Sequence, residues 1–306
     1  MPRIPRHLIK DPDRCYHIIS RTTGQEFTLG DVEKEFLLQR IKFLSSVYFV
    51  NVLTFCILSN HFHLLIQMGN HENYSDEEIE RRFRAYYGPK RPFPKEKADD
   101  YRTKWSDLSE YVKEVKQGFS FWYNRRHDRR GYFWSERFKS VVVEEGAALM
   151  ACMAYIDLNA VRAGLVDRPE AYRFCGLGYH VQSGNKGRFL SLGLLGLENV
   201  QESPLASYRR FVYEMGSLER SDGKRPIPKA ISGKEERAGY RITRPALFRY
   251  RSRYFTESVV LGSRVFVKAL YRRLQPCLKT RKDRAPVRVQ GSEGLYSLKR
   301  LNASST

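Results

Sequence analysis

The chain has 306 residues and a formal charge of +20, because 54 Lys and Arg outnumber 34 Asp and Glu. That balance excludes an acidic protein and indicates a polyanionic partner. With 42% hydrophobic and 13% aromatic residues, the composition can bury a sizeable core, which excludes a collagen-like or wholly disordered chain. The length suits about two domains.

Cysteine usage and the N-terminal residues bear on the compartment. The five cysteines are scattered singly, form no C-x-x-C pair and are odd in number. Neither a disulfide framework nor a cysteine zinc site is therefore expected. The basic N-terminal residues lack the apolar stretch of a secretory signal. Both features predict a protein of the reducing cytoplasm.

The first seventy residues contain three strand patterns and one helix pattern. Residues 15–21 are rich in strand formers, and 31–48 has apolar residues at helical spacing. Two further β-rich runs, 51–58 and 61–68, are separated by a Ser-Asn pair that can form a tight turn. The two runs predict a hairpin.

A membrane span is the alternative for part of this region, because residues 43–70 contain no Lys, Arg, Asp or Glu. Ser, Asn, His and Gln interrupt the stretch, and no run of about 18 apolar residues survives. Buried strands are the better explanation, and no membrane partner is expected.

The next hundred residues complete one fold pattern. Residues 71–106 are polar and contain Gly and Pro, which predicts an inserted surface segment. A helix pattern follows over 108–127, then a β-branched strand over 138–143 and a second helix over about 147–158. The order β-α-β-β-α-β-α predicts an α+β fold, a ferredoxin-like antiparallel sheet with packed helices.

Charge divides the chain into two parts. Residues 1–200 have 30 basic and 25 acidic residues, whereas residues 201–306 have 24 and 9. We therefore expect a folded domain over about 1–185 and a basic, partly helical extension over 186–306. The extension has aromatics among arginines at 241–254 and a helical pattern over 259–274, which suits either a small DNA-binding appendage or a partly disordered basic tail.

His61 and His63 lie at the start of the third predicted strand, with Phe62 between them. Because side chains alternate along a strand, both imidazoles share one face. Two such ligands can chelate one divalent ion. From the spacing alone, a pair of hydrogen-bonded strand histidines is the commoner explanation.

Two strings extend this signal. Residues 58–66 read Leu-Ser-Asn-His-Phe-His-Leu-Leu-Ile, and 155–165 read Tyr-Ile-Asp-Leu-Asn-Ala-Val-Arg-Ala-Gly-Leu. Together with 15–21, 121–127 and 132–139, they resemble the single-tyrosine HUH transposases, most closely the REP-associated tyrosine transposases. The resemblance covers about residues 1–180.

This resemblance implies a site and a reaction. His61 and His63 would be the metal ligands, Asn159 a third ligand through its amide oxygen, and Tyr155 the nucleophile. Tyr155 and Asn159 are four residues apart and so share a helix face. The implied activity is metal-dependent cleavage and rejoining of single-stranded or hairpin-forming DNA through a 5′-phosphotyrosine. Oxygen ligands favour Mg²⁺ or Mn²⁺ as the cofactor.

Basic residues beside aromatics are a second signal, since they pair phosphate charges with stacking surfaces. One such cluster is 81–87; a solvated cationic face is the other explanation for any single cluster. The residues expected to bind DNA are Arg21, Arg125, Arg126, Arg129, Arg130, Arg137, Lys139 and Arg162.

Several alternatives stay open. Tyr123 and Tyr132 are rival nucleophiles. The same positive surface also suits a non-catalytic DNA-binding or regulatory protein, or an RNA-binding module. In the family some members dimerise, so a homodimer is one expected assembly, and a bacterial protein of this kind would be nucleoid-associated.

Overall fold

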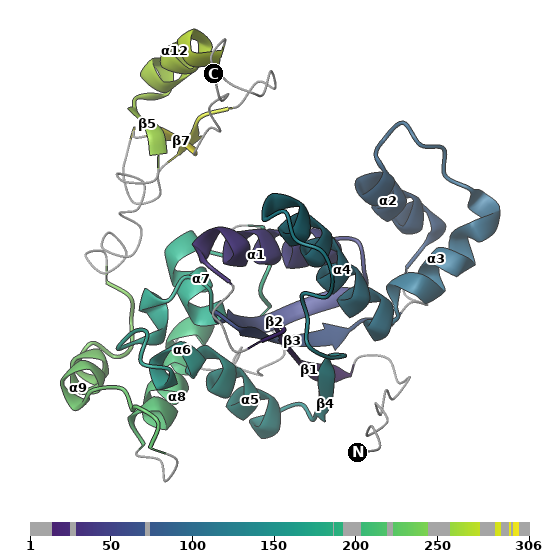
Figure 1. Cartoon of the computed structure of the whole chain (residues 1–306). Helices are drawn as coiled ribbons and strands as arrows, with labels where there is room; N and C mark the ends of the chain where they lie inside the picture. The colour runs from purple at the N-terminus through teal and green to yellow at the C-terminus, as the bar shows by residue number, and fades with distance from the viewer. Residues whose placement is uncertain are drawn as a thin grey trace. The chain divides into compact units, whose positions relative to one another are not determined.

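The computed structural model describes residues 14–24, 29–70, 74–185, 187–191, 203–218, 223–243, 258–275, 285–288, 294 and 296–299. It divides into two compact units, the first comprising Met1–His180 and Gly184–Tyr240, the second Val181–Ser183 and Arg241–Thr306. Figure 1 shows the elements of both units.

The described residues of the first unit form four strands and most of the helices. Its elements are β1 (Cys15–Arg21), α1 (Asp31–Ser45), β2 (Val50–Ile57), β3 (His61–Met68), α2 (Asp76–Tyr87), η2 (Lys95–Lys97), α3 (Ala98–Trp105), α4 (Leu108–Arg126), β4 (Lys139–Val143), α5 (Ala147–Asp157), α6 (Asn159–Arg162), η3 (Pro169–Ala171), α7 (Gly176–Ser183), α8 (Pro204–Ser217) and α9 (Lys229–Arg237).

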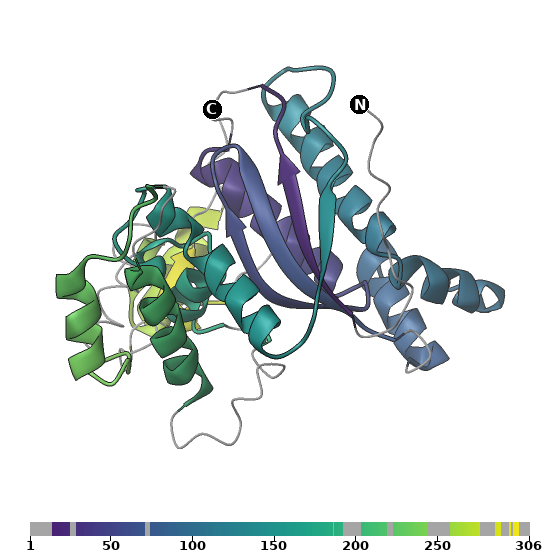
Figure 2. The same ribbon diagram turned by 90° about the horizontal axis from the view of Figure 1, so that it is seen from below.

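The four strands form an antiparallel sheet in the order β2-β3-β1-β4, as a ferredoxin-like fold requires. Helices α1 and α4 pack together on one face, and α5 covers the other (Figure 1). Figure 2 shows α5 lying across the strands. The predicted α+β class and its element order are therefore confirmed.

Residues 43–70 form the end of α1 and then β2 and β3, whose side chains are almost all buried. No helix among the described residues is long and apolar enough to cross a bilayer. The strand interpretation of this uncharged stretch is confirmed.

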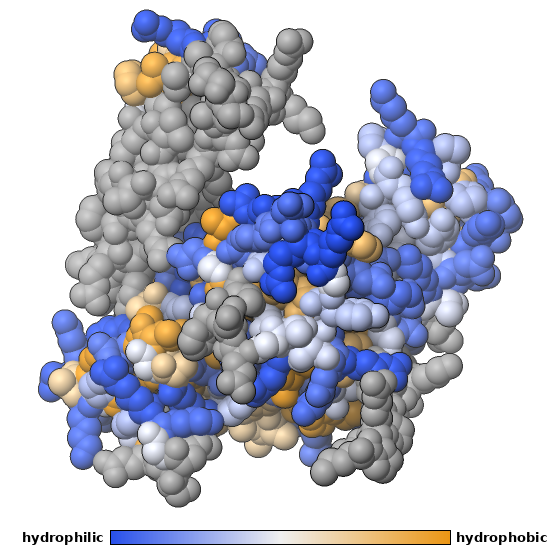
Figure 3. Space-filling model, viewed as in Figure 1, coloured by the Kyte–Doolittle hydropathy of each residue, from blue (hydrophilic) through white to orange (hydrophobic). Residues whose placement is uncertain are grey.

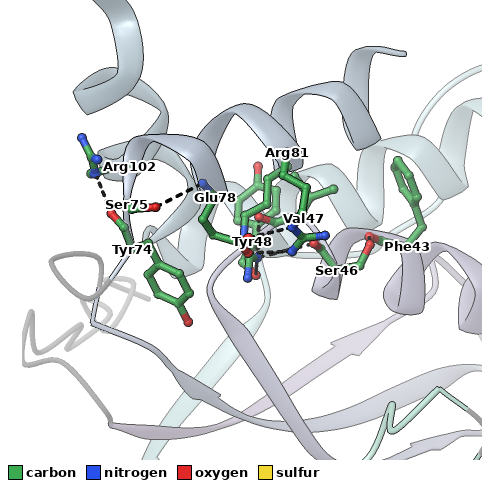
Figure 4. Close-up of polar contacts among 10 residues, drawn as sticks. Phe43, Ser46, Val47, Tyr48, Tyr74, Ser75, Glu78, Arg81 and Arg102 are labelled. Carbon is green, nitrogen blue, oxygen red and sulfur yellow. Dashed lines mark hydrogen bonds and ion pairs between the residues drawn. The ribbon is translucent and has the colours of Figure 1, made fainter. Parts of the chain in front are cut away.

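The segment predicted as a surface insertion contains helices α2, η2 and α3. Ser75 caps α2 by accepting a hydrogen bond from the Glu78 backbone. Arg82 donates at 2.9 Å to the carbonyls of Val47 and Tyr48, in the turn that precedes β2. Figure 4 shows Glu78 of α2 close to Val47 and Tyr48 of this turn. These charge-assisted hydrogen bonds from a half-buried cation help to hold the segment to the domain.

The first unit also runs further than the boundary expected at residue 185. Helix α8 packs on α5 and α9 packs on α8. Arg209 of α8 is buried and donates to the buried carboxylate of Glu170 at 2.7 Å. An ion pair of this kind, far from water, ties α8 to the domain.

The second unit is described for part of its length. It contains β5 (Ser258–Gly262), α12 (Arg264–Leu274), β6 (Val287–Arg288) and β7 (Tyr296–Lys299), with the sheet order β5-β7-β6. The helix predicted over 259–274 was wrong in its first part, since 258–262 form a strand and Ser263 caps α12. Most of the basic and aromatic stretch at 241–254 lies outside the described residues.

Candidate active site

His61 and His63 lie on the α5 side of β3, with their ring centroids 5.1 Å apart. Phe62 lies on the other side, where its ring contacts Trp134 at 5.4 Å and Trp134 contacts Phe119 of α4. The alternation of the strand therefore separates the imidazoles from the apolar core.

Tyr155 comes to this pair from α5. Its half-buried ring lies edge-on to His63, with centroids 5.9 Å apart. The guanidinium of Arg162 lies 5.5 Å from the centroid of the Tyr155 ring, a cation–π contact. Of the predicted residues, the structure thus brings together the two histidines of β3, Tyr155 and Arg162.

The end of α5 is fixed by a buried carboxylate two residues beyond Tyr155. Asp157 accepts hydrogen bonds from Thr54 of β2 at 2.9 Å, from the Leu177 backbone at 3.0 Å and from Tyr208 at 2.6 Å. Residues of β2, α7 and α8 therefore hold the last turn of α5, which contains Tyr155. Such support is what keeps a reactive side chain in one geometry.

Asn159 does not continue α5, because the helix ends at Asp157 and Asn159 opens the short α6. The Asn159 amide nitrogen donates to the Tyr155 carbonyl at 3.0 Å and to the Ile156 carbonyl at 3.4 Å. The expected single helix face was wrong, but the two residues still touch through this bond. A role of the Asn159 amide oxygen as a metal ligand stays a prediction.

His17 is the residue that the sequence analysis missed. It lies on β1, and its Nε2 is 2.9 Å from Nδ1 of His63. Its ring also contacts Tyr155, at a centroid distance of 6.1 Å. The available signal was a histidine in a predicted strand, yet only the pairing of Ile19 with His63 places His17 diagonally beside it.

The three imidazoles are neutral at pH 7. Burial is the main cause that lowers the pKa of His17 and His61 to about 4 and the pKa of His63 to about 3. Arg21, opposite His61 in the strand register, adds to the effect on both His61 and His63. Neutral imidazoles keep the lone pair that binds a metal.

The donor set suits a divalent ion held by two imidazoles. Nδ1 of His61 is 2.6 Å from Oδ1 of Asn60, which can only accept, so Nε2 of His61 has the lone pair. Two rings bound through nitrogens at about 2.1 Å to one ion have centroids roughly 5–6 Å apart, and 5.1 Å agrees with this. The described part of the chain contains no group of three or more His, Cys, Asp and Glu that could hold a metal ion.

The residues expected to bind DNA fall into two groups. Arg21 and Lys139 lie on strands in register with His61 and with Ile19, and Arg162 lies over Tyr155. The other five are exposed, at the end of α4 and in the segment before β4. The five exposed residues are Arg125, Arg126, Arg129, Arg130 and Arg137. Figure 3 shows strongly hydrophilic side chains gathered over α1 and α4.

The cluster at 81–87 offers less free charge than its sequence suggests. Arg81 and Arg82 both pair with Glu78, and Arg84 pairs with Glu80. Ion pairs three and four residues apart along one helix neutralise much of this positive charge. We therefore do not include it in the site.

Two other tyrosines differ from Tyr155 in their surroundings. Tyr123 is 6% exposed and packs on Phe133, with ring centroids 4.4 Å apart. Tyr132 is 92% exposed. Neither has an imidazole pair beside it: the ring contact that Tyr123 makes with a histidine is to the exposed His127.

Comparisons with known proteins add one likeness. No family model matches the sequence, and no curated protein matches it. A structure described as a REP-associated tyrosine transposase bound to a REP hairpin is similar in fold, with a TM-score of 0.42 and 14% identity. The match covers 74% of this chain and 100% of that one. A likeness this weak carries no argument for the activity, which has to rest on the residues of this chain.

Proposed function

We propose that the protein is a metal-dependent endonuclease and strand transferase that acts on single-stranded or hairpin-forming DNA through Tyr155. The observation that supports this most is the meeting of His63 and Tyr155 from two distant elements, with rings 5.9 Å apart. The motifs that resemble the single-tyrosine HUH transposases fall on these same residues. The charge of +20 supports a polyanionic substrate.

The cofactor that suits this site is Mg²⁺ or Mn²⁺, which His61 and His63 would hold through Nε2. When bound, such an ion offsets the charge of a phosphate and makes its phosphorus open to attack. Asn159, which bonds to the Tyr155 turn, would add its amide oxygen to the ligands.

The chain's own residues perform the transfer. The Tyr155 oxygen bonds to phosphorus as the bond from phosphorus to the 3′ oxygen breaks. The phenol loses its proton to solvent, and the 3′ oxygen gains one and leaves as a hydroxyl. Arg162, beside the phenol ring, favours the negative charge that develops there. In the reverse step a 3′-hydroxyl attacks the 5′-phosphotyrosine and rejoins the strand without ATP.

The test is an adduct assay. The protein is incubated with end-labelled hairpin DNA that has single-stranded flanks, with Mg²⁺, with Mn²⁺ or with a chelator. We expect a labelled, protease-sensitive band on a denaturing gel that appears only with metal. Binding without an adduct on any hairpin and with either metal would instead support the non-catalytic DNA-binding alternative.

A further inference from the structure

We propose that His17 is a positioning residue that holds His63 in the tautomer whose Nε2 faces the metal. The inference deepens the proposed function and rests on it for the identity of the ligands. It starts from a hydrogen bond between two buried imidazoles, His17 Nε2 and His63 Nδ1, at 2.9 Å. Neither ring has a carboxylate as its hydrogen-bond partner among the described contacts.

A bond between two neutral imidazoles needs one donor and one acceptor. If His17 donated, the proton of His63 would lie on Nε2 and no lone pair would remain there for a metal. If His17 accepts, His63 has its proton on Nδ1 and its lone pair on Nε2. Only the second arrangement matches His61, whose Nδ1 donates to Asn60.

Each of the two proposed ligands is therefore oriented by a hydrogen bond that its Nδ1 donates to a neighbouring side chain. Asn60 precedes His61 in the chain and accepts from its Nδ1, whereas His17 reaches His63 from β1. Outer hydrogen bonds of this type fix the tautomer and ring plane of a metal-binding histidine, and their loss weakens metal affinity by about 10–100-fold.

His17 also fixes where the ring of His63 lies. The two rings stack with centroids 5.1 Å apart and an interplanar angle of 24°. The edge of Tyr155 lies over both, 6.1 Å from His17 and 5.9 Å from His63. His17 thus has two separate effects: its ring packs against the phenol, and its Nε2 accepts a hydrogen bond from Nδ1 of His63.

Two substitutions divide these effects. His17→Gln keeps an acceptor near the position of Nε2, and His17→Phe keeps the ring without any acceptor. His127→Gln is the matched control, because His127 is an exposed histidine bonded to Glu33 at 3.2 Å. Thermal unfolding of each full-length variant checks that it is folded.

The first measurement is the tautomer of His63 in metal-free protein, read from long-range proton–nitrogen NMR spectra of histidine-labelled full-length chain. We expect the proton on Nδ1 in the wild type and in His17→Gln, and a shift toward Nε2 in His17→Phe. A wild-type His63 protonated on Nε2 would overturn the proposal, whatever the variants do.

The second measurement is Mn²⁺ affinity by calorimetric titration without DNA. His17→Phe should raise the dissociation constant by about 10–100-fold, whereas His17→Gln and His127→Gln should stay near the wild type. Equal affinities of wild type and His17→Phe would contradict the role of His17. If the wild type bound no Mn²⁺, the metal-dependent function would fail, while the NMR spectra would still decide the hydrogen bond.

Discussion

At the scale of single residues, the surroundings of Tyr155 distinguish it from the other tyrosines of this domain. Its ring touches His17, His63 and the guanidinium of Arg162. Phe at this position keeps those ring contacts and removes only the hydroxyl. We expect Tyr155→Phe to abolish both cleavage and the covalent DNA adduct, with thermal stability close to that of the wild type.

The adduct assay should distinguish this variant from two controls. Tyr123→Phe alters a buried packing residue and Tyr132→Phe an exposed one, and both should keep the adduct. Mapping the labelled peptide to a tyrosine other than Tyr155 would show the assignment to be wrong.

The imidazole pair gives a second residue-level prediction. His61→Ala with His63→Ala should remove metal-dependent cleavage and lower Mn²⁺ affinity, because both Nε2 ligands are lost. Affinity for hairpin DNA in a chelator should change less than about threefold, since phosphate and stacking contacts dominate binding. An unchanged cleavage rate in the double variant would exclude these histidines as ligands.

Sequence patterns predicted which residues belong to the candidate site more fully than they predicted how those residues contact one another. The alternation of His61, Phe62 and His63 predicted a common face, and the structure confirms it. The bond from His17 could not be predicted, because it depends on how β1 pairs with β3. A single sequence does not contain that register.

At the scale of elements, one cation of α2 makes several of the contacts that join the segment α2–η2–α3 to the domain. The Arg82 guanidinium lies 4.9 Å from the Phe49 ring and 5.0 Å from the Tyr74 ring, besides its bonds to the turn before β2. Arg82→Met keeps most of the stem and loses these bonds, each worth about 1.5–3 kcal/mol to a charged donor. We expect amide hydrogen exchange in α2 to speed up by at least about tenfold.

Arg81→Met is the matched control for this prediction. Arg81 pairs with the same Glu78, but its side chain is 63% exposed, so its loss should change little. Equal exchange rates in the two variants would mean that the ion pair, and not the bonds to the turn, holds the segment.

Element boundaries show where local patterns are sufficient. Strands 15–21 and 61–68 were predicted to the residue. The helix expected to 48 ends at Ser45, because the chain must turn there before β2. For the polar stretch 71–106 the sequence predicts a surface insertion but not its helices. Long-range contacts such as those of Arg82 help to fix these helices, and a local pattern does not reveal such contacts.

At the scale of the whole molecule, the extent of the first unit can be tested by truncation. A chain ending at residue 185 leaves Glu170, which is fully buried, without Arg209 and Tyr213. It also leaves Asp157 without Tyr208. Removing one partner of a buried ion pair costs about 3–5 kcal/mol.

We therefore expect residues 1–185 to unfold at much lower urea concentration than residues 1–243, which keep these partners. The measurement is a urea unfolding curve of each fragment by circular dichroism. Similar midpoints would show that α8 and α9 contribute little to the fold.

The second unit holds most of the excess charge, since residues 241–306 have 16 basic and 3 acidic residues. Deleting residues 244–306 should flatten the salt dependence of binding to single-stranded DNA. Each lost phosphate contact lowers the slope of log K against log salt by about 0.7. Titrations at four salt concentrations measure it, and an unchanged slope would mean that this unit does not touch the DNA.

The separation of the site along the chain has a consequence for protein synthesis. A ribosome-bound chain that has emerged only as far as α4 contains both histidines of β3 but not Tyr155. The ring contact between Tyr155 and His63 joins residues of α5 and β3 that are far apart in the chain, and contacts between such distant segments are slow to form. Under the proposed function, a chain that lacks α5 has no nucleophile, so DNA cleavage would require synthesis to proceed past Tyr155.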